Sequence, residues 1–581
     1  MTNNRYNLRQ RKNLNYSENK NNKRKTESIE TCENKKIKLD SKSSSKMESN
    51  ILFEMGNKFE NMVFDNLKQR YGSLVKKVCY TTEDMKNKTL CKFTKKYMEQ
   101  GYPFIIQAML VNNNNNTFGV ADLLVRSDFI NNLTNNKILE TNLINYRAKL
   151  LDGNYHYLVI DIKWSTMNLT ANETNILNQN RYNAYKGQLA VYNLALGLMQ
   201  GYIPDCAYIL AKEWRCKSKD TKNFNCFDKL GVIDYANFDK KYIELTANAV
   251  NWIREVRTNG NNWSCYEPER EEMCPNMTIN NNKWNSVKNE IASHNKELTL
   301  LWMVGQKNRQ YANDNDVYKW DDKKCSSSTL NLKGKIGDIV DKLIEINNSD
   351  DKLIFPDIIT NNDYGWQKEG KLDFFVDFET LNECFIKKEM TLNNSKTNTN
   401  MIFMISIQYK ENGKYSTKTF KTNDKSFDIQ KERYILDEFK KFIENKAKKL
   451  KSPIKFFHWS QAEYNFLNNA NKRHFGIYSD FINKIKFVDV CKIFTNEPIV
   501  VKNMFNFKLK EVANAFRSHG LIKTQWDDNI DNGFVAMMKA SNYYANKDDN
   551  KKIIDDISEY NKNDCVVLWE IVDYLRKHHC K

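Results

Sequence analysis

Short apolar runs alternate with amphipathic stretches between residues 51 and 256. The runs have the length of buried strands, and the amphipathic stretches repeat apolar residues every three to four positions, as helices do. The expected elements, in order, are a helix at 53–71, strands at 104–111, 118–125 and 157–164, a helix at 181–198 and a strand at 206–211. This alternation predicts an α/β domain over residues 49–257, with a polar loop at 165–180.

A second set of such elements follows residue 368. Strands are expected at 372–380, 401–409, 418–421 and 454–459, the last of which leads into residues 460–467, and helices are expected at 434–445 and 557–568. They predict a second α/β domain, with a mixed sheet, over residues 369–581. Residues 258–368 are interpreted as a mostly helical connector without assigned chemistry. Within it, 297–305 has helical spacing, and Trp302 is expected to be a core residue rather than a base-stacking one.

Residues 1–48 contain many Asn, Lys and Ser residues and few large apolar ones, so they are expected to form a disordered basic tail. Two groups of basic residues have the spacing of a bipartite nuclear import signal: Lys20 with Lys23, Arg24 and Lys25, and Lys35 with Lys36 and Lys38. A generic arm that strengthens non-specific binding to nucleic acid explains them equally well. Nucleus and cytoplasm both remain open as locations.

The chain has 90 Lys and Arg against 72 Asp and Glu, which gives a net charge of +18 and favours a polyanionic partner such as nucleic acid. No apolar run is long enough to span a bilayer and no signal segment is visible, so an intracellular protein without a membrane partner is expected. The 13 cysteines are scattered without a C-x-x-C pair, which predicts reduced thiols.

One carboxylate and one ammonium interrupt the apolar run at 157–164. Asp161 and Lys163 are two positions apart, so in a strand they project from the same face. Asp161 is a hard oxygen ligand of the kind that Mg²⁺ prefers, and Lys163 could orient a water or offset phosphate charge. Asp122, within another apolar run, is the natural second ligand. An ordinary edge-strand ion pair is the competing interpretation.

The second half repeats this chemistry. Asp377 and Glu379 lie two positions apart in an apolar strand, and like charges this close are stabilised by a cation. Tyr560 and Asp564 are four positions apart and would share one face of the last helix. The pattern favours a site for two divalent metal ions.

The first half resembles the PD-(D/E)XK nucleases of the RecB-like branch. The motifs are Gly119 to Asp122, then Asp161-Ile162-Lys163, then Gln188 to Tyr192, and an opening helix with G-x-x-F-E in which Glu60 is the acidic residue. This resemblance implies a restriction-endonuclease-like core. It also implies that Glu60, Asp122 and Asp161 bind metal and that Gln188 and Tyr192 support the site. Some of these nucleases hold an iron–sulfur cluster, but the cysteine grouping for one is not visible, so none is predicted.

The second half resembles the RNase H-like, DnaQ-like exonucleases of the DEDD class whose last motif is Y-x-x-x-D. The resemblance implies that Asp377, Glu379 and Asp564 hold Mg²⁺ or Mn²⁺ and that Tyr560 positions the attacking water. The second motif departs from the family, because Glu463 stands where an aspartate is usual. Glu463 can still bind the cation with one more methylene of reach. Asp489 is the rival for that role and is interpreted instead as a structural acid at a strand end.

Together the two resemblances predict a divalent-metal-dependent nuclease that hydrolyses phosphodiester bonds. DNA is favoured over RNA, and the expected role is the processing of DNA ends, with 3′→5′ exonuclease activity in the second domain and a helicase or a replication or repair protein as a partner. The alternative is a nucleic-acid-binding scaffold in which one or both nuclease centres have lost turnover.

Overall fold

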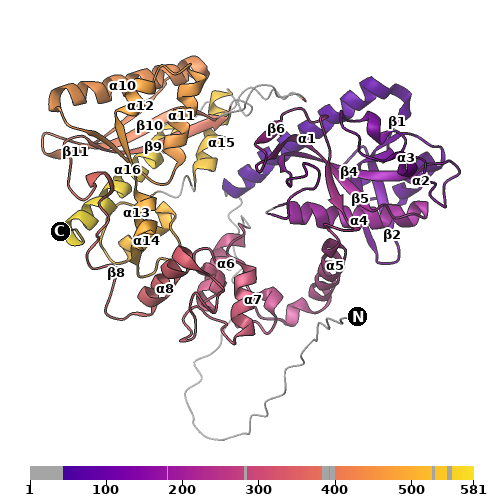
Figure 1. Ribbon diagram of the computed structural model, residues 1–581, viewed down its shortest axis with the longest axis horizontal. Helices are drawn as coiled ribbons and strands as arrows, with labels where there is room; N and C mark the ends of the chain where they lie inside the picture. Colours follow the sequence, from indigo (N-terminus) through magenta and orange to yellow (C-terminus); the bar gives the residue numbers. More distant parts are fainter. Residues whose placement is uncertain are drawn as a thin grey trace, which may run out of the picture. The chain divides into compact units, whose positions relative to one another are not determined.

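The computed structural model describes residues 44–179, 181–280, 284–382, 392, 400–526, 530, 532–545 and 552–580. It is a mixed α/β structure with two large sheets, as the sequence predicted (Figure 1). The two clusters of basic residues and most of the expected tail lie outside the described residues. The first helix, α1 (Ser44–Tyr71), begins inside the stretch that was expected to be tail.

The first sheet has the order β1-β2-β3-β4-β5-β6, with β7 paired to β5. Its strands are β1 (Val75–Lys77), β2 (Phe104–Asn112), β3 (Thr117–Arg126), β4 (Tyr157–Asn168), β5 (Cys206–Cys216), β6 (Thr221–Asn223) and β7 (Gly231–Asp234). Strands β2, β3 and β4 are antiparallel, whereas β4 and β5 are parallel.

Helices cover both faces of this sheet. Ile106 and Ile160 share a buried cluster with Phe59 of α1, whereas the adjacent residues Ile105 and Val159 belong to a cluster that contains residues of α4 (Tyr182–Gln200). Successive strand residues point to opposite faces, so a continuous apolar run is the pattern of a sheet that is buried on both sides. Three further helices, α2 (Cys91–Glu99), α3 (Thr141–Ile144) and α5 (Lys241–Asn259), complete this half.

The expected polar loop at 165–180 is wrong in its first part, because β4 continues to Asn168. After a register shift between Lys163 and Thr166, β4 pairs again with β5 as far as Asn168 and Arg215. The polar side chains of this extension are compatible with a strand because it is only partly buried.

The second sheet has the order β11-β10-β9-β12-β13. Its strands are β9 (Asp373–Asn382), β10 (Asn400–Glu411), β11 (Lys414–Lys421), β12 (Ile454–His458) and β13 (Ile485–Asp489). Strands β9, β10 and β11 are antiparallel neighbours, and β12 lies parallel to both β9 and β13. This is the antiparallel start and mixed sheet that the sequence predicted.

Helices also cover both faces of the second sheet. Phe374 packs in a cluster with Phe439 of α10 (Ile429–Leu450), while its neighbour Phe375 packs in a cluster with Leu568 of α16 (Lys552–His578). The remaining helices are α11 (Ala462–Arg473), α12 (Ser479–Asn483), α13 (Val490–Asn496), α14 (Leu509–Ser518) and α15 (Gly533–Tyr544).

Helices α6 (Asn285–His294), α7 (Gln306–Asp314) and α8 (Gly334–Asn348) lie in the expected connector, which also contributes β8 (Ile354–Phe355). Strand β8 pairs with β14 (Val500–Val501), and Ile339 and Leu343 of α8 share a buried cluster with Phe375 and Leu568. Much of the connector therefore packs as part of the second α/β body.

The helix expected at 297–305 is wrong. A single 3₁₀ turn spans Leu298–Leu300, and Met303 adopts a left-handed backbone conformation that a continuous helix excludes. Trp302 nevertheless packs in the core as expected, with its ring centroid 5.0 Å from that of Phe507.

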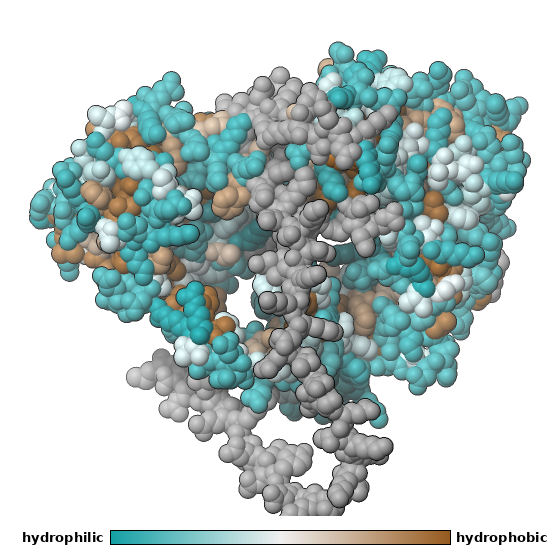
Figure 2. All heavy atoms as spheres, turned by 180° about the vertical axis from the view of Figure 1, so that it is seen from behind, coloured by the Kyte–Doolittle hydropathy of each residue, from teal (hydrophilic) through white to brown (hydrophobic). Residues whose placement is uncertain are grey.

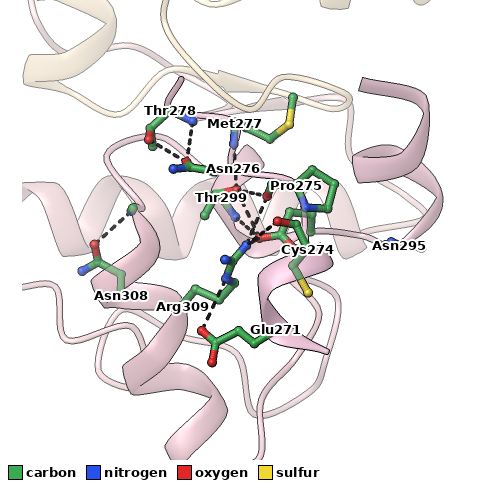
Figure 3. Close-up of polar contacts among 12 residues, drawn as sticks. Glu271, Cys274, Pro275, Asn276, Met277, Thr278, Asn295, Thr299, Asn308 and Arg309 are labelled. Carbon is green, nitrogen blue, oxygen red and sulfur yellow. Dashed lines mark hydrogen bonds and ion pairs between the residues drawn. The ribbon is translucent and has the colours of Figure 1, made fainter. Parts of the chain in front are cut away.

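A buried arginine organises the loop before α6 (Figure 3). Arg309 of α7 is 4% exposed, and its Nη1 donates hydrogen bonds to Glu297 Oε1 at 3.0 Å and to the Pro275 carbonyl at 3.1 Å. Thr299 Oγ1 donates to the same carbonyl, at 3.1 Å, and accepts a bond from the Met277 N–H. These bonds engage the carbonyl, carboxylate and hydroxyl groups of a segment that has little regular structure.

Candidate active sites

Asp122 and Asp161 lie opposite each other where β3 and β4 separate. The last paired residues of the two strands are Leu123 and Ile160, so the next opposite positions belong to the two aspartates. The Ile162 N–H donates to Asp122 Oδ2 at 2.7 Å. The Asp122 side chain thus takes a donor that would otherwise continue the ladder, and both carboxylates gather at the open end of the strand pair.

Lys163 reaches the same place. Its ammonium lies 2.6 Å from Asp161 Oδ2, which confirms that the two side chains share one face of β4. Asp161 is only 1% exposed, and its other oxygen, Oδ1, accepts no hydrogen bond from any described residue. A buried carboxylate oxygen without a partner is costly, so this atom is available to a ligand.

The charges at this centre act on one another. Burial and then the neighbouring Asp161 and Glu60 raise the pKa of Asp122 well above its ordinary value. Burial, the largest influence on Lys163, lowers the pKa of its ammonium, but Asp161 and Asp122 more than offset it, so the pKa is raised overall. The lysine therefore stays charged beside the carboxylates.

The other predicted residues surround these carboxylates. Glu60 of α1 accepts a hydrogen bond from Gln107 Nε2, and burial raises the pKa of Glu60 to about 6. On α4, Gln188 Nε2 donates to the Tyr192 hydroxyl at 3.0 Å. Burial, with Asp161 and Asp122 nearby, raises the pKa of Tyr192. The ligand oxygens of the three acids do not all come within 4.8 Å of one another, so these acids are spaced more widely than those of the second centre.

The second centre is more compact. Ligand oxygens of Asp377 and Glu379, from β9, and of Asp564, from α16, all lie within 4.8 Å of one another. Glu379 is 4% exposed and Asp564 is 8% exposed. The i, i+2 spacing in β9 places the first two side chains on one face, and the last helix brings the third one to them.

Two residues that were not predicted from the sequence form hydrogen bonds to these carboxylates. Trp526 Nε1 donates to Asp564 Oδ1 at 2.8 Å, and Asn561 Nδ2 donates to Asp377 Oδ2. Asn561 lies three residues before Asp564 on α16, so helical spacing alone could have indicated it. No sequence signal indicates Trp526, because it comes from the loop after α14.

Burial and mutual repulsion raise the pKa values of all three carboxyl groups. Burial, and then Asp564, Glu379 and Glu463, raise the pKa of Asp377 well above its ordinary value. Burial, with Asp564 and Glu463 nearby, raises the pKa of Glu379 to about 8. Burial raises the pKa of Asp564 to about 7, although the Trp526 hydrogen bond and Lys510 lower it. Without a cation the cluster therefore retains protons at neutral pH.

Glu463, at the start of α11, lies beside this cluster rather than within it. It is 5% exposed, and it adds to the raised pKa values of Asp377, Glu379 and Asp564. Its Oε2 lies 3.6 Å from His458 Nδ1 and accepts no hydrogen bond from the described residues. Its role as a further ligand stays a prediction.

Asp489 has the structural contacts expected of a strand-end acid. Its Oδ1 accepts hydrogen bonds from the Ser460 and Lys492 N–H groups at 3.0 and 3.1 Å, and its Oδ2 accepts one from Gln461 Nε2 at 3.1 Å. These bonds cap α13 and hold the loop that leads to Glu463.

Tyr560 lies one turn before Asp564 on the same helix. Burial and the nearby carboxylates raise the pKa of its hydroxyl far above the ordinary value, so the group stays protonated. The Lys510 ammonium lies 4.7 Å from the centre of its ring and 5.3 Å from that of Trp526. The water-positioning role of Tyr560 stays a prediction.

The donor set of the second centre fits a divalent metal ion. Carboxylate oxygens are the ligands that Mg²⁺ and Mn²⁺ prefer. Three clustered acids, two of them buried, whose pKa values are raised by burial and by neighbouring carboxylates are also an environment that a cation would stabilise. Asp377, Glu379 and Asp564 would hold such an ion, and Glu463 Oε2, which accepts no hydrogen bond from the described residues, lies beside them.

A family model described as RNase H superfamily matches residues 384–576. The C-terminal domain is RNase H-like. A domain of this superfamily indicates a nuclease that acts on nucleic acid. The match begins after Glu379, so the place of the Asp377–Glu379 pair rests on the geometry alone. No curated protein and no solved structure matches the chain. The RecB-like resemblance of the first half gains no support here and stays a prediction.

Proposed function

We propose that the RNase H-like domain hydrolyses phosphodiester bonds of nucleic acid with divalent metal bound by Asp377, Glu379 and Asp564. The observation that carries this proposal is the approach of the three carboxylates to within 4.8 Å in a buried centre. When bound, Mg²⁺ or Mn²⁺ supplies charge stabilisation for the attacking and leaving oxygens.

The side chains around the cluster have distinct tasks in this proposal. Asn561 and Trp526 orient Asp377 and Asp564 by hydrogen bonds, so the carboxylates meet substrate in a fixed geometry. The protonated Tyr560 hydroxyl orients a water by donating or accepting a hydrogen bond. Lys510 lowers the pKa values of Glu379 and Asp564, and its positive charge would also attract a phosphate.

The first α/β domain is a second candidate nuclease centre, of the PD-(D/E)XK type. The observation that favours it is the meeting of Asp122, Asp161 and Lys163 at the open end of β3 and β4, with an unpartnered Asp161 oxygen. In this proposal Asp122, Asp161 and Glu60 would hold the metal. Lys163 would offset phosphate charge, and Gln188 and Tyr192 would support the site.

The finer assignments are part of the same proposal. We infer the processing of DNA ends, rather than RNA cleavage, with 3′→5′ polarity in the second domain and a helicase or a replication or repair protein as partner. The polarity follows from the resemblance to DEDD exonucleases. A nuclear location would require the basic clusters to act as an import signal.

The decisive experiment is the cleavage of 5′- and 3′-labelled single- and double-stranded DNA and RNA in Mg²⁺ or Mn²⁺. Wild type is compared with Asp161→Ala, Asp377→Ala and the double variant. Each single variant is expected to remove a distinct set of products, because each removes a ligand from a different centre.

A metal titration supplies the control for this experiment. Mn²⁺ should raise the melting temperature of wild type by binding to the folded state, and Asp377→Ala should reduce that rise. If only one variant changes cleavage, the other domain holds substrate without cutting it. If nothing is cut and nucleic acid still binds, the chain is a scaffold with inactive centres.

A further inference from the structure

A cavity of about 620 Å³ runs along the edge strand β13, from Ile485 to Asp489, and reaches His458 at the end of β12. Its walls come from Tyr364 in the 3₁₀ turn Asp363–Gly365, His458 at the end of β12, Tyr464 on α11, Lys486 and Phe487 on β13, and Lys492 on α13. Neither the metal ligands nor the motifs of the sequence account for this combination of aromatic and cationic side chains.

The aromatic side chains form a surface on which a flat ring could stack. The Tyr464 ring lies 5.1 Å from the Phe487 ring, edge to face, and the His458 ring lies 5.9 Å from Phe487. Tyr464 remains 41% exposed. Exposed rings held in place by neighbouring rings are the platforms on which nucleobases stack.

Tyr364 is held in an unusual backbone conformation. Its φ is +56°, a left-handed value that is rare for a residue with a bulky side chain, and its side chain is 60% exposed. Lys455 Nζ donates to the carbonyl of the next residue, Gly365, at 2.7 Å and so fixes the turn. Strain of this kind persists where the surroundings enforce it, and it often marks a ligand-binding position.

Both cationic and acidic groups line the cavity: Lys486 and Lys492 on one hand, Asp363 and Asp489 on the other. Lys486 and Lys492 are exposed. The oxygens of Asp489, which also lines the cavity, accept hydrogen bonds from Ser460, Gln461 and Lys492, so this carboxylate is already engaged. Two lysines beside aromatic rings match a nucleotide, which has a phosphate and a base.

The cavity adjoins the proposed metal centre through one residue. His458 lines the cavity, and its Nδ1 lies 3.6 Å from Glu463 Oε2. Tyr464, on the cavity wall, directly follows Glu463. A nucleotide in the cavity would therefore be close to a phosphodiester at the carboxylate cluster.

We propose that this cavity binds one nucleotide unit of a single-stranded nucleic acid whose backbone continues to the carboxylate cluster. The base stacks against Tyr364 and the Tyr464–Phe487 pair, and Lys486 and Lys492 contact the phosphates. This inference rests on the proposed function of the second centre.

The test measures binding without cleavage. Asp377→Asn protein is titrated against a fluorescein-labelled single-stranded DNA in metal-free buffer, and fluorescence anisotropy is followed. Tyr364→Ala, made in the same protein, is expected to raise the Kd at least about fivefold, since a stacked base contributes about 1–3 kcal/mol. The pair Lys486→Ala and Lys492→Ala should flatten the dependence of log K on log salt by about 1.4, which corresponds to two lost phosphate contacts.

Matched variants on α10 serve as controls. Tyr434→Ala is the control for the aromatic ring, because Tyr434 is 56% exposed and lies outside the cavity. The double substitution Lys441→Ala and Lys448→Ala is the control for charge, because it removes two positive charges from an exposed helix surface. The cavity proposal is overturned if Tyr364→Ala and Tyr434→Ala bind equally well, or if both lysine pairs change the salt dependence equally. Because binding needs no turnover, loss of binding in Tyr364→Ala would support the cavity even if wild type cut nothing. If all the cavity variants cleaved normally, the cavity proposal would be wrong, but the nuclease proposal would be unaffected.

Discussion

Asp377, Glu379 and Asp564 share a buried space in which each carboxyl group makes ionisation of the others harder. The pKa of Glu379 is about 8 and that of Asp564 about 7, well above the values of these side chains in an unfolded chain. The arrangement costs stability unless a cation is present, which is common where residues serve function rather than folding.

This repulsion predicts a pH dependence of stability. The metal-free folded protein holds more protons than the unfolded chain between about pH 4 and about pH 8, so its stability should fall as pH rises through that range. Melting temperatures in EDTA should show this fall, and saturating Mn²⁺ should reduce it. Glu379→Gln should also reduce it, because one titrating group is gone. An identical slope in wild type and Glu379→Gln would contradict the assignment.

Gly119 shows how closely the first centre is packed. A Cβ at this position would lie 2.3 Å from Cε1 of Tyr192, so the ring would have to move. We expect Gly119→Ala to destabilise the protein by about 1–3 kcal/mol, the usual cost of overpacking, as measured by urea unfolding.

Gly56 provides the control for this prediction. It lies within α1, and a Cβ there would meet no heavy atom within 4 Å. Gly56→Ala should stabilise the protein slightly, by about 0.5–1 kcal/mol, because alanine favours a helix. Equal effects of the two substitutions would show that Tyr192 is not held against β3.

Much of each candidate site could be predicted because it depends on local spacing. Residues two apart in a strand or four apart in a helix share a face whatever the rest of the fold does, which is why Asp161 with Lys163 and Asp377 with Glu379 were found. The contribution of Trp526 could not be predicted, because a loop brings it to Asp564 through packing that no local pattern encodes.

At the scale of elements, α4 links the stability of the first domain to its candidate chemistry. Lys186 of this helix is completely buried, and its Nζ donates to Asp239 Oδ1 at 2.6 Å and to the Ile176 carbonyl at 2.7 Å. The same helix carries Gln188 and Tyr192. Its ion pair therefore fixes the position from which those two side chains approach the carboxylates.

Lys186→Met should destabilise the protein by about 3–5 kcal/mol, since it leaves Asp239 buried without its cation. Lys95→Met is the matched control, because Lys95 and Glu99 form an exposed pair at 3.8 Å; a change of at most about 1 kcal/mol is expected there. Denaturant unfolding of both variants measures the difference. If Lys186→Met and Lys95→Met lowered the free energy of unfolding equally, the buried pair would stabilise the protein no more than the exposed one does.

Element types were predicted better than element ends. Residues 297–305 were expected to be a helix because their apolar residues recur at helical spacing, yet Leu298 and Leu301 are buried by a 3₁₀ turn and a bend. Helical spacing over one or two turns cannot separate these outcomes, since both bury the same residues. The full length of β4 was missed because its last residues are polar and its pairing with β5 is not visible locally.

At the scale of the whole molecule, the net charge and the hydrophilic surface both favour binding to a polyanion. The net charge is +18, and hydrophilic side chains predominate on the face shown in Figure 2, with hydrophobic ones in small scattered groups. None of the described helices has both the length and the apolarity that a membrane crossing requires. A protein with this positive charge is expected to bind nucleic acid largely through the release of counterions from the phosphates.

Binding of single-stranded DNA to Asp377→Asn protein should therefore weaken steeply as salt rises, with log K linear in log salt. Deletion of residues 1–43 should weaken binding at low salt and flatten the slope, because it removes an excess of Lys and Arg. Anisotropy titrations at several salt concentrations measure both. A slope that the deletion leaves unchanged would mean that the folded part makes all the phosphate contacts.

Asn561 and Asp377 are 184 residues apart in the chain, yet they are joined by a hydrogen bond at the second centre. During synthesis the two acids of β9 are made long before α16, which supplies the third. A growing chain that has not reached α16 lacks one of the three carboxylates, so it could not assemble the complete carboxylate cluster. Under the nuclease proposal, the order of synthesis delays cutting by this domain until α16 has been made and has packed against β9.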